Sequence, residues 1–468
     1  MKELSPLILR QLVVQSLNII FSIYSARLLS VESYAYLNLN LYVYASLSLL
    51  ADLGLWSVYQ RSSSEESKKF QFVIFKISLI FTSLLAIPFL LLTAFGQLNI
   101  LKNIAEIIGL LLTVICTVLN QFQNFMMAVY EKKLAVKSIA HVEILQSLIF
   151  YSVILFIINA KLDIWTIFIA FFLRLLIPII WYIRNFIIKN YRHSNKPISP
   201  KEFVKCHREL IGSGLKFQSS RWIYAVKDLY VVWFCAKNLT LTMYGNYTWL
   251  IAVGSYPSLV LLIQQRIYLP LFSKLVLFND NKLASLASAL IIKNLWIIYP
   301  ASIYSLYYSS ELVQLVFGEK WGHLSSMIWM YSSSLFSTPF VIVCMSYLDA
   351  RGKSQINLYM SLIWSTLTIF GISIILLSKG LQGYGLFISS TQILNLAYFI
   401  VCKKLFSFSS LKKISLNLFF IAAFSSLIIM IVENLMIYSP IKYTYIIITG
   451  LIINIIYSFY IYKTITTE

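Results

Sequence analysis

The chain has 468 residues, of which 59% are hydrophobic and only 12% charged, and its formal net charge is +20. Soluble domains carry about 25% charged residues, so this composition excludes a water-soluble globular protein. Its apolar stretches run unbroken for about the 20 residues that a membrane-spanning helix needs, without the alternation of an outer-membrane barrel. The sequence therefore predicts an all-α, multi-pass integral membrane protein.

Hydropathy predicts fourteen transmembrane helices along the chain. Six precede the longest polar segment, residues 189–214, and eight follow it. The first six spans are Leu7–Ala26, Tyr36–Trp56, Phe72–Phe95, Ile104–Val129, Ile139–Ile158 and Ile164–Ile188. The other eight are Leu215–Cys235, Tyr247–Leu269, Ala289–Tyr308, Ser325–Leu348, Ile356–Leu377, Leu386–Cys402, Leu416–Ile437 and Tyr443–Tyr462.

The distribution of basic residues predicts the orientation of the chain. An even number of spans places both termini on one side of the membrane, and Lys and Arg collect in cytoplasmic loops. With the N-terminus inside, cytoplasmic loops and their flanks hold roughly 28 Lys and Arg, against about seven on the other side. We therefore expect both termini and the segment 189–214 to be cytoplasmic, and we interpret the positive charge as topology, with no nucleic-acid partner.

An internal repeat with an offset of 210 residues relates the two halves of the chain. Ala26-Arg27 is followed by Tyr34-Ala35-Tyr36, and Ala236-Lys237 is followed at the same distance by Tyr244-Gly245-Asn246-Tyr247. Both copies begin on the cytoplasmic side, so the halves should be related by an axis along the membrane normal. The predicted parts are a six-helix bundle (1–188), a basic cytoplasmic linker (189–214), a second six-helix bundle (215–403) and two additional helices (404–468).

Polar stripes on three predicted spans mark candidate functional positions, because polar groups are costly within a bilayer. Three faces of this kind would suit a water-filled cavity between two bundles. The alternative is that they hold packed helices together. The candidate lining residues are Gln11, Gln15 and Asn18 in the first span, Asn120 and Asn124 in the fourth, and Tyr224 in the seventh.

Cations dominate over anions inside the predicted spans. A cavity lined by cations should prefer an anionic substrate, and Arg suits bidentate contact with phosphate. The candidate substrate-binding cations are Arg10, Arg174, Arg221, Lys227 and Arg266, while Lys76 and Lys293 are better explained by snorkelling to the headgroups. The membrane anions are Asp52, Glu106, Glu143, Asp228 and Glu433. We name Asp52 and Asp228 as candidates for ion coupling; in the alternative, Asp228 only pairs with Arg221 or Lys227.

No catalytic pattern is present in the sequence. It contains no Gly-rich phosphate loop, no HExxH and no set of Ser, His and Asp that spacing would unite. The five cysteines have no paired spacing and the four histidines are scattered, so we expect neither a disulfide nor a metal site. The protein is therefore not expected to be an enzyme or to need a cofactor.

Several short motifs give the chain a family resemblance. They are residues 26–36 after the first span, Asp52-Leu53-Gly54-Leu55 with Arg61, Tyr244-Gly245-Asn246-Tyr247, Pro270, and Phe317-Gly318-Glu319-Lys320-Trp321. With the two six-helix halves and two extra helices, the chain resembles the bacterial polysaccharide flippases of the Wzx type, which export O-antigen or capsule repeat units. Their superfamily also holds multidrug antiporters and lipid II flippases. One departure is Ala35, where such proteins usually have Gly.

The resemblance implies a function and partners. The substrate would be an undecaprenyl-pyrophosphate-linked oligosaccharide repeat unit, moved from the cytoplasmic to the periplasmic leaflet of the bacterial inner membrane by ion-coupled alternating access. It also implies contact with membrane lipids and with polysaccharide polymerase and chain-length machinery. The alternatives are a lipid II flippase or multidrug antiporter of the same superfamily, and a multi-span polymerase or ligase. An antiporter of cationic drugs would favour an acidic cavity, and a polymerase would carry a large periplasmic loop.

Overall fold

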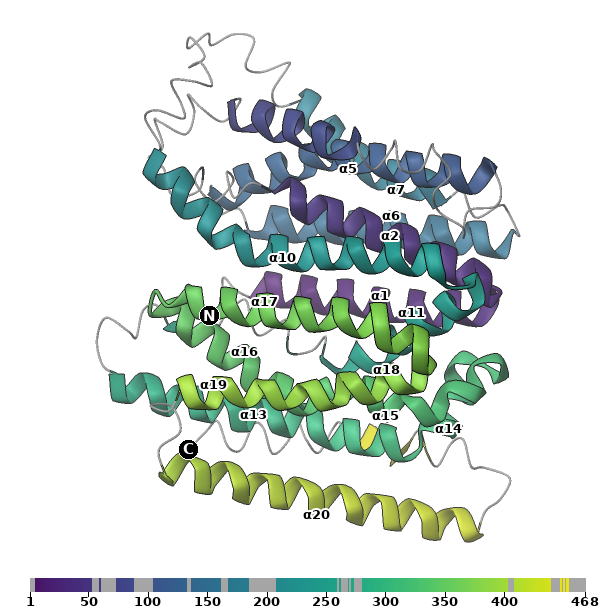
Figure 1. The fold of residues 1–468 in the computed structure, drawn as a ribbon, viewed down its shortest axis with the longest axis vertical. Coiled ribbons are helices and arrows are strands. Elements are labelled where there is room, and N and C mark those ends of the chain that lie inside the picture. The colour runs from purple at the N-terminus through teal and green to yellow at the C-terminus, as the bar shows by residue number, and fades with distance from the viewer. Residues whose placement is uncertain are drawn as a thin grey trace. The chain divides into compact units, whose positions relative to one another are not determined.

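The computed structural model describes residues 5–52, 59, 73–87, 104–132, 136–160, 167–184, 208–258, 261, 268, 271–272, 280–402, 408–438, 447, 449–450 and 452–453. Over these residues the secondary structure is helical throughout, without a strand, which confirms the predicted all-α class (Figure 1). Five of the described helices are long and apolar enough to cross a membrane, and a pair bent by 42° makes a sixth. Helices lie in the first thirteen predicted spans. The few described residues of the last, Tyr443–Tyr462, are also helical, but most of that span is outside the described residues, so the count of fourteen stays a prediction.

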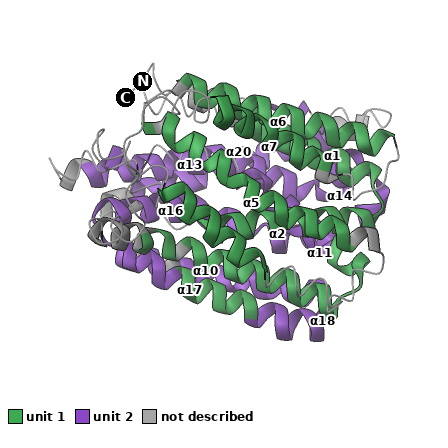
Figure 2. Ribbon diagram, turned by 90° about the horizontal axis from the view of Figure 1, so that it is seen from above, with its two compact units in different colours: residues 1–245, 361–369 green, residues 246–360, 370–468 purple. Residues whose placement is uncertain are grey.

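The helices divide into two compact units, coloured separately in Figure 2. Unit 1 comprises residues 1–245 and 361–369, and unit 2 comprises residues 246–360 and 370–468. The predicted linker 189–214 is described only from Arg208, where a helix already begins. The bundle boundaries inferred from sequence stay a prediction.

Unit 1 is built from long apolar helices that pack in pairs. Its helices are α1 (Ser5–Leu28), α2 (Val31–Ala51), a helix over Val73–Ile87, α5 (Ile104–Lys132), α6 (Val136–Asn159), α7 (Ile167–Tyr182) and α10 (Arg208–Asn238). α1 packs on α6, α5 on α7, and α2 on both α5 and α10. One shared core takes a buried side chain from each of α1, α2, α5, α6 and α7, which are Phe21, Leu37, Cys116, Phe150 and Phe171. Burial of such side chains holds the unit together.

Unit 2 contains more interrupted helices. α11 (Leu241–Ser255) starts in unit 1 and continues into unit 2, and α17 (Ser354–Phe370) is also shared. The others are η3 (Tyr256–Ser258), α13 (Asp280–Tyr307), α14 (Ser309–Phe317), η4 (Glu319–Met327), α15 (Ile328–Tyr331), α16 (Ser334–Ala350), η5 (Gly371–Leu376), α18 (Leu377–Thr391), η6 (Gln392–Asn395), α19 (Leu396–Val401) and α20 (Phe408–Tyr438). Gly318 (φ 94°) ends α14 and Gly380 (φ 66°) interrupts α18, and both have backbone angles that favour glycine.

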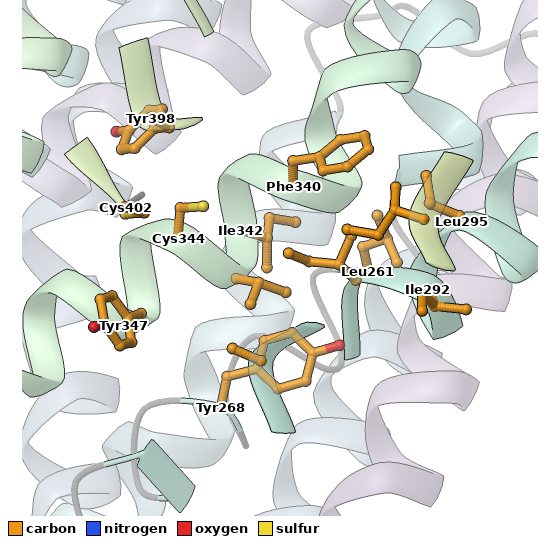
Figure 3. Close-up of a cluster of buried hydrophobic side chains, with 14 of the residues drawn as sticks. Leu261, Tyr268, Ile292, Leu295, Phe340, Ile342, Cys344, Tyr347, Tyr398 and Cys402 are labelled. Carbon is orange, nitrogen blue, oxygen red and sulfur yellow. The ribbon is translucent and has the colours of Figure 1, made fainter. Parts of the chain in front are cut away.

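A cluster of buried side chains joins α13, α16 and the end of α19 in unit 2 (Figure 3). Cys344 and Cys402 belong to this cluster, where their thiols are neighbours. Both cysteines are free thiols. The pair is a contact that sequence spacing did not indicate, because α16 and the end of α19 are brought together only by the fold.

Candidate functional site

The turn between α1 and α2 has the same structure as the turn between α10 and α11, 210 residues later. In the first turn, the Ser30 hydroxyl accepts a hydrogen bond from the amide of Ser33 at 3.1 Å. In the second, the Thr240 hydroxyl accepts one from the amide of Met243 at 3.2 Å. A hydroxyl at this position satisfies an otherwise unpaired amide and fixes the start of the helix. The repeat found in sequence is therefore a repeat of local structure.

The two turns lie directly against each other. The Thr242 hydroxyl donates a hydrogen bond to the carboxylate of Glu32, its repeat-equivalent residue, at 2.7 Å. A Cβ atom on Gly245 would lie 2.6 Å from the carbonyl oxygen of Val31 and 3.3 Å from the methyl group of Ala35. Since Cβ atoms do not approach backbone this closely, residue 245 has room only for glycine. The first residues of α2 and α11 thus meet through backbone and small side chains.

α10 lies along α2 and caps its end. The Gln218 amide donates a hydrogen bond to the Leu49 carbonyl at 3.3 Å, and the Trp222 indole donates one to the Asp52 carbonyl at 3.0 Å. The last carbonyls of a helix have no partner within the helix, so these bonds fix the end of α2 on α10. The backbone of Asp52, a predicted coupling residue, therefore contacts Trp222, which follows Arg221 in the sequence.

The charged face of α10 contains an ion pair. The Lys227 ammonium lies 2.6 Å from the carboxylate of Asp228, and both side chains are partly buried. Asp228 also acts electrostatically on the phenol groups of Tyr42 and Tyr244. Of the two partners that the sequence offered to Asp228, the structure thus pairs it with Lys227, while Arg221 has an exposed side chain.

Arg10 forms a buried ion pair with Glu143, 133 residues away. Its Nη2 donates a hydrogen bond to Glu143 Oε1 at 2.5 Å, and its Nε contacts the other carboxylate oxygen. The two side chains are 8% and 18% exposed, and removing one partner of such a pair costs about 3–5 kcal/mol. The pair joins α1 to α6. Sequence reasoning recognised Glu143 only as one of several membrane anions and did not find this role.

Arg174 is enclosed by aromatic rings inside unit 1. Its guanidinium lies over the Phe150 ring, 5.5 Å from the centroid, and acts electrostatically on the phenols of Tyr44 and Tyr151. Its Nε is buried, and among the described residues it has neither a hydrogen-bond partner for that atom nor an ion pair. The side chain as a whole is half-buried. A membrane cation without a counter-charge is costly, so this position favours the arrival of an anion.

The predicted polar stripes have several different surroundings. On α5, the Asn120 amide lies 3.5 Å from the Ser48 hydroxyl of α2, so part of that stripe is a contact between packed helices. On α1, Asn18 donates a hydrogen bond to Gln15 at 3.3 Å within the same helix. Asn124 and Tyr224 are half-buried. The Gln11 side chain and the whole of Arg266 lie outside the described residues. The role of all these residues as cavity lining stays a prediction.

A family model of polysaccharide biosynthesis proteins matches residues 25–326, which is more than half of the chain. The chain belongs to this family. No curated protein sequence matches it. Among solved structures it is similar to the lipid II flippase MurJ in an inward closed conformation, with 15% identity and a TM-score of 0.69 over 98% of this chain and 99% of that one.

Two further solved structures have a fold similar to that of this polysaccharide biosynthesis family member. An inward-facing multidrug resistance MATE transporter of the MOP superfamily matches with 14% identity and a TM-score of 0.64, over 88% of this chain and 98% of that one. The outward-facing conformation of a MATE transporter matches with 14% identity and a TM-score of 0.58, over 89% and 96%. These likenesses establish the fold. Among the described residues, no group of three or more His, Cys, Asp or Glu could hold a metal ion.

Proposed function

We propose that this protein is a flippase for an undecaprenyl-pyrophosphate-linked oligosaccharide repeat unit, which it moves from the cytoplasmic to the periplasmic leaflet. The observation that carries the substrate class is Arg174, a half-buried guanidinium without a counter-charge among the described residues. A transporter of cationic drugs would be disfavoured by such a group. The family match to polysaccharide biosynthesis supports a glycan carried on the lipid.

Electrostatics explains why a pyrophosphate suits this interior. A pyrophosphate that enters a region of low dielectric loses much of its hydration, and a fixed guanidinium offsets part of this loss through charge-assisted hydrogen bonds of about 1.5–3 kcal/mol each. Arg174 and Arg221 are the cations proposed to take part. Arg10 and Lys227 are weaker candidates, because Glu143 and Asp228 already neutralise them. The lipid tail would remain in the bilayer while the polar head group crosses.

The contact between the two turns supports alternating access as the mechanism. Gly245 approaches Val31 closely, and in the proposed mechanism this contact closes one end of the substrate pathway. We propose that this contact opens when the substrate is released, and that protonation or ion binding at Asp228 or Asp52 drives the change. In the proposed cell context, polysaccharide polymerase and chain-length machinery would receive the product.

A lipid II flippase is the second candidate. The structural similarity to MurJ extends over 98% of this chain with a TM-score of 0.69, higher than that of the two MATE structures compared. The two candidates differ in the glycan rather than in the lipid pyrophosphate, so the cationic site would serve either. The match to a polysaccharide biosynthesis family favours the repeat unit.

The test compares Arg174 with a membrane cation outside the site. Cells that lack this protein should lose surface polysaccharide and accumulate lipid-linked oligosaccharide. Reintroduced Arg174→Ala should restore about a tenth of export or less, and Arg174→Lys should restore only part, because an ammonium keeps the charge without the planar fork. The matched control is Lys76→Ala, whose side chain is exposed on the helix Val73–Ile87. At matched protein levels, normal export by Arg174→Ala would remove the basis of the proposal. Unchanged surface polysaccharide in the deletion strain would contradict the function itself.

A further inference from the structure

A row of aromatic rings with an ammonium group runs along α10 at steps of three or four residues and winds partly around the helix, because three residues fall about 60° short of a full turn. We call these residues the α10 ladder: Tyr224, Lys227, Tyr230, Trp233 and Phe234. The Lys227 ammonium lies over the Tyr224 ring, 5.6 Å from its centroid. The Tyr230 ring lies 5.9 Å from that of Trp233 and is stacked 5.7 Å from that of Phe234. All five side chains are half-buried, so part of each remains accessible. The Lys237 ammonium covers one face of the Trp233 ring, 5.4 Å from its centroid.

The other copy of the repeat does not carry this ladder. The positions of α1 that are equivalent to Tyr224, Lys227, Tyr230 and Trp233 all hold aliphatic residues, which are Val14, Leu17, Ile20 and Ile23. Only the end of the helix matches, where Phe234 corresponds to Tyr24 and Lys237 to Arg27. An aromatic residue and a cation near the end of a span are typical anchors at the membrane surface. Surface anchoring therefore explains the shared end but not the four residues before it.

We infer that the α10 ladder is the oligosaccharide-binding subsite of the flippase, an inference that rests on the proposed function. A pyranose ring has one face of C–H groups, which packs flat on an aromatic ring, and a rim of hydroxyl groups. Tyr and Trp offer both an apolar ring and a polar O–H or N–H for that rim. The Lys227 ammonium adds a donor for sugar hydroxyls or for an acidic sugar.

The order of residues along α10 fits a substrate with a charged end and a sugar end. Arg221, a candidate for the pyrophosphate, precedes the ladder, which then extends toward the turn with α11. From Tyr224 to Phe234 the helix rises about 15 Å, the length of a short oligosaccharide. In the predicted topology the turn is periplasmic and Arg221 lies nearer the cytoplasmic end of the span, so a pyrophosphate held at Arg221 would place its sugars along the ladder, toward the periplasmic side.

The experiment measures binding of two lipids to the purified full chain in detergent. One probe is the lipid-linked oligosaccharide pool extracted from cells that lack this protein, and the other is undecaprenyl pyrophosphate without sugar. Tyr230→Ala and Trp233→Ala should each weaken binding of the first probe by about tenfold, the effect of a lost ring contact and its buried area. Binding of the sugar-free lipid should stay within about twofold, which also reports that the variants are folded. Tyr230→Phe and Trp233→Phe keep the rings and should keep most of the binding.

Matched controls come from the first copy of the repeat. Ile20→Ala and Ile23→Ala alter the equivalent positions of α1 and should leave both probes bound as in the wild type. Unchanged binding of the glycosylated probe in the Tyr230 and Trp233 variants, or an equal loss for both probes, would overturn the subsite and leave the flippase function standing. If the wild type bound neither lipid, this result would contradict the proposed function and, with it, the subsite.

Discussion

α1 and α10 hold the same place in two copies of one repeat, yet their side chains perform different tasks. On α1 the amides of Gln15 and Asn18 bond to each other at 3.3 Å. On α10 the residue equivalent to Asn18 is Asp228, which forms an ion pair with Lys227 at 2.6 Å. Both helices end in a turn capped by a hydroxyl. The turn depends on a few local residues, so it persists while the exposed faces diverge.

This difference gives α10 a charged and aromatic face that α1 does not have. α10 has a charged face, aromatic rings and contacts to the end of α2, whereas the main charged contact of α1 is the buried pair of Arg10 with Glu143. A buried ion pair between helices serves packing and orientation. A half-buried, mixed face of cations and rings serves recognition. Of these two helices, we therefore expect α1 to act more as scaffold and α10 more as binding surface.

The largest effect is expected from Gly245→Ala, which breaks the contact between the copies. In an ordinary helix, Gly→Ala stabilises by about 1 kcal/mol. Here the added methyl group would lie 2.6 Å from the Val31 carbonyl, so we expect a lower melting temperature in detergent and a loss of export of tenfold or more. Gly322→Ala is the control, because its Cβ would meet only the Gln314 side chain at 3.7 Å. A Gly245→Ala protein that is as stable and active as the wild type would contradict the close contact.

A smaller effect is expected when the second copy is given the residues of the first. Arg221→Gln and Asp228→Asn convert α10 to the Gln11 and Asn18 of α1. We expect Arg221→Gln to reduce export severalfold, and Asp228→Asn to weaken coupling, measured as export across a range of external pH at equal protein levels. The double variant separates two explanations. If it regains full export, Arg221 serves only to balance Asp228; if it remains defective, Arg221 acts on the substrate.

The smallest effect concerns the hydrogen bond between Thr242 and Glu32. The bond lowers the pKa of the Glu32 carboxylate in the folded protein. The folded state is therefore stabilised at neutral pH and loses this stabilisation as the pH falls through the lowered pKa of Glu32. We expect the melting temperature of the wild type to fall between about pH 6 and about pH 3 slightly more than that of Thr242→Val. Ser33→Ala serves as a control on the same turn. Parallel pH curves for the wild type and Thr242→Val would argue against the bond.

Sequence alone reached the helical class, the repeat and the family, because these depend on hydropathy and on short local patterns. It did not predict which side chains contact each other within the predicted spans. Arg10 and Glu143 are 133 residues apart, and each reads as an isolated charge until α1 is packed on α6. Cys344 and Cys402 likewise become neighbours only through the fold. Side-chain positions were needed to identify Lys227 as the ion-pair partner of Asp228, because the sequence spacing allowed Arg221 equally well.

If the proposed function holds, the contact of Gly245 with Val31 has a consequence for how flippases of this kind diversify. It is formed by a carbonyl oxygen and a residue without a side chain, so it makes no demand on the chemistry of the cargo. Cells that change the sugars of their surface polysaccharide could keep the contact of Gly245 with Val31 and exchange only the residues of the α10 ladder. Exchanging the ladder residues between relatives should then transfer the preference for a glycan. Evolution could thus alter the substrate without changing the contact between the two turns.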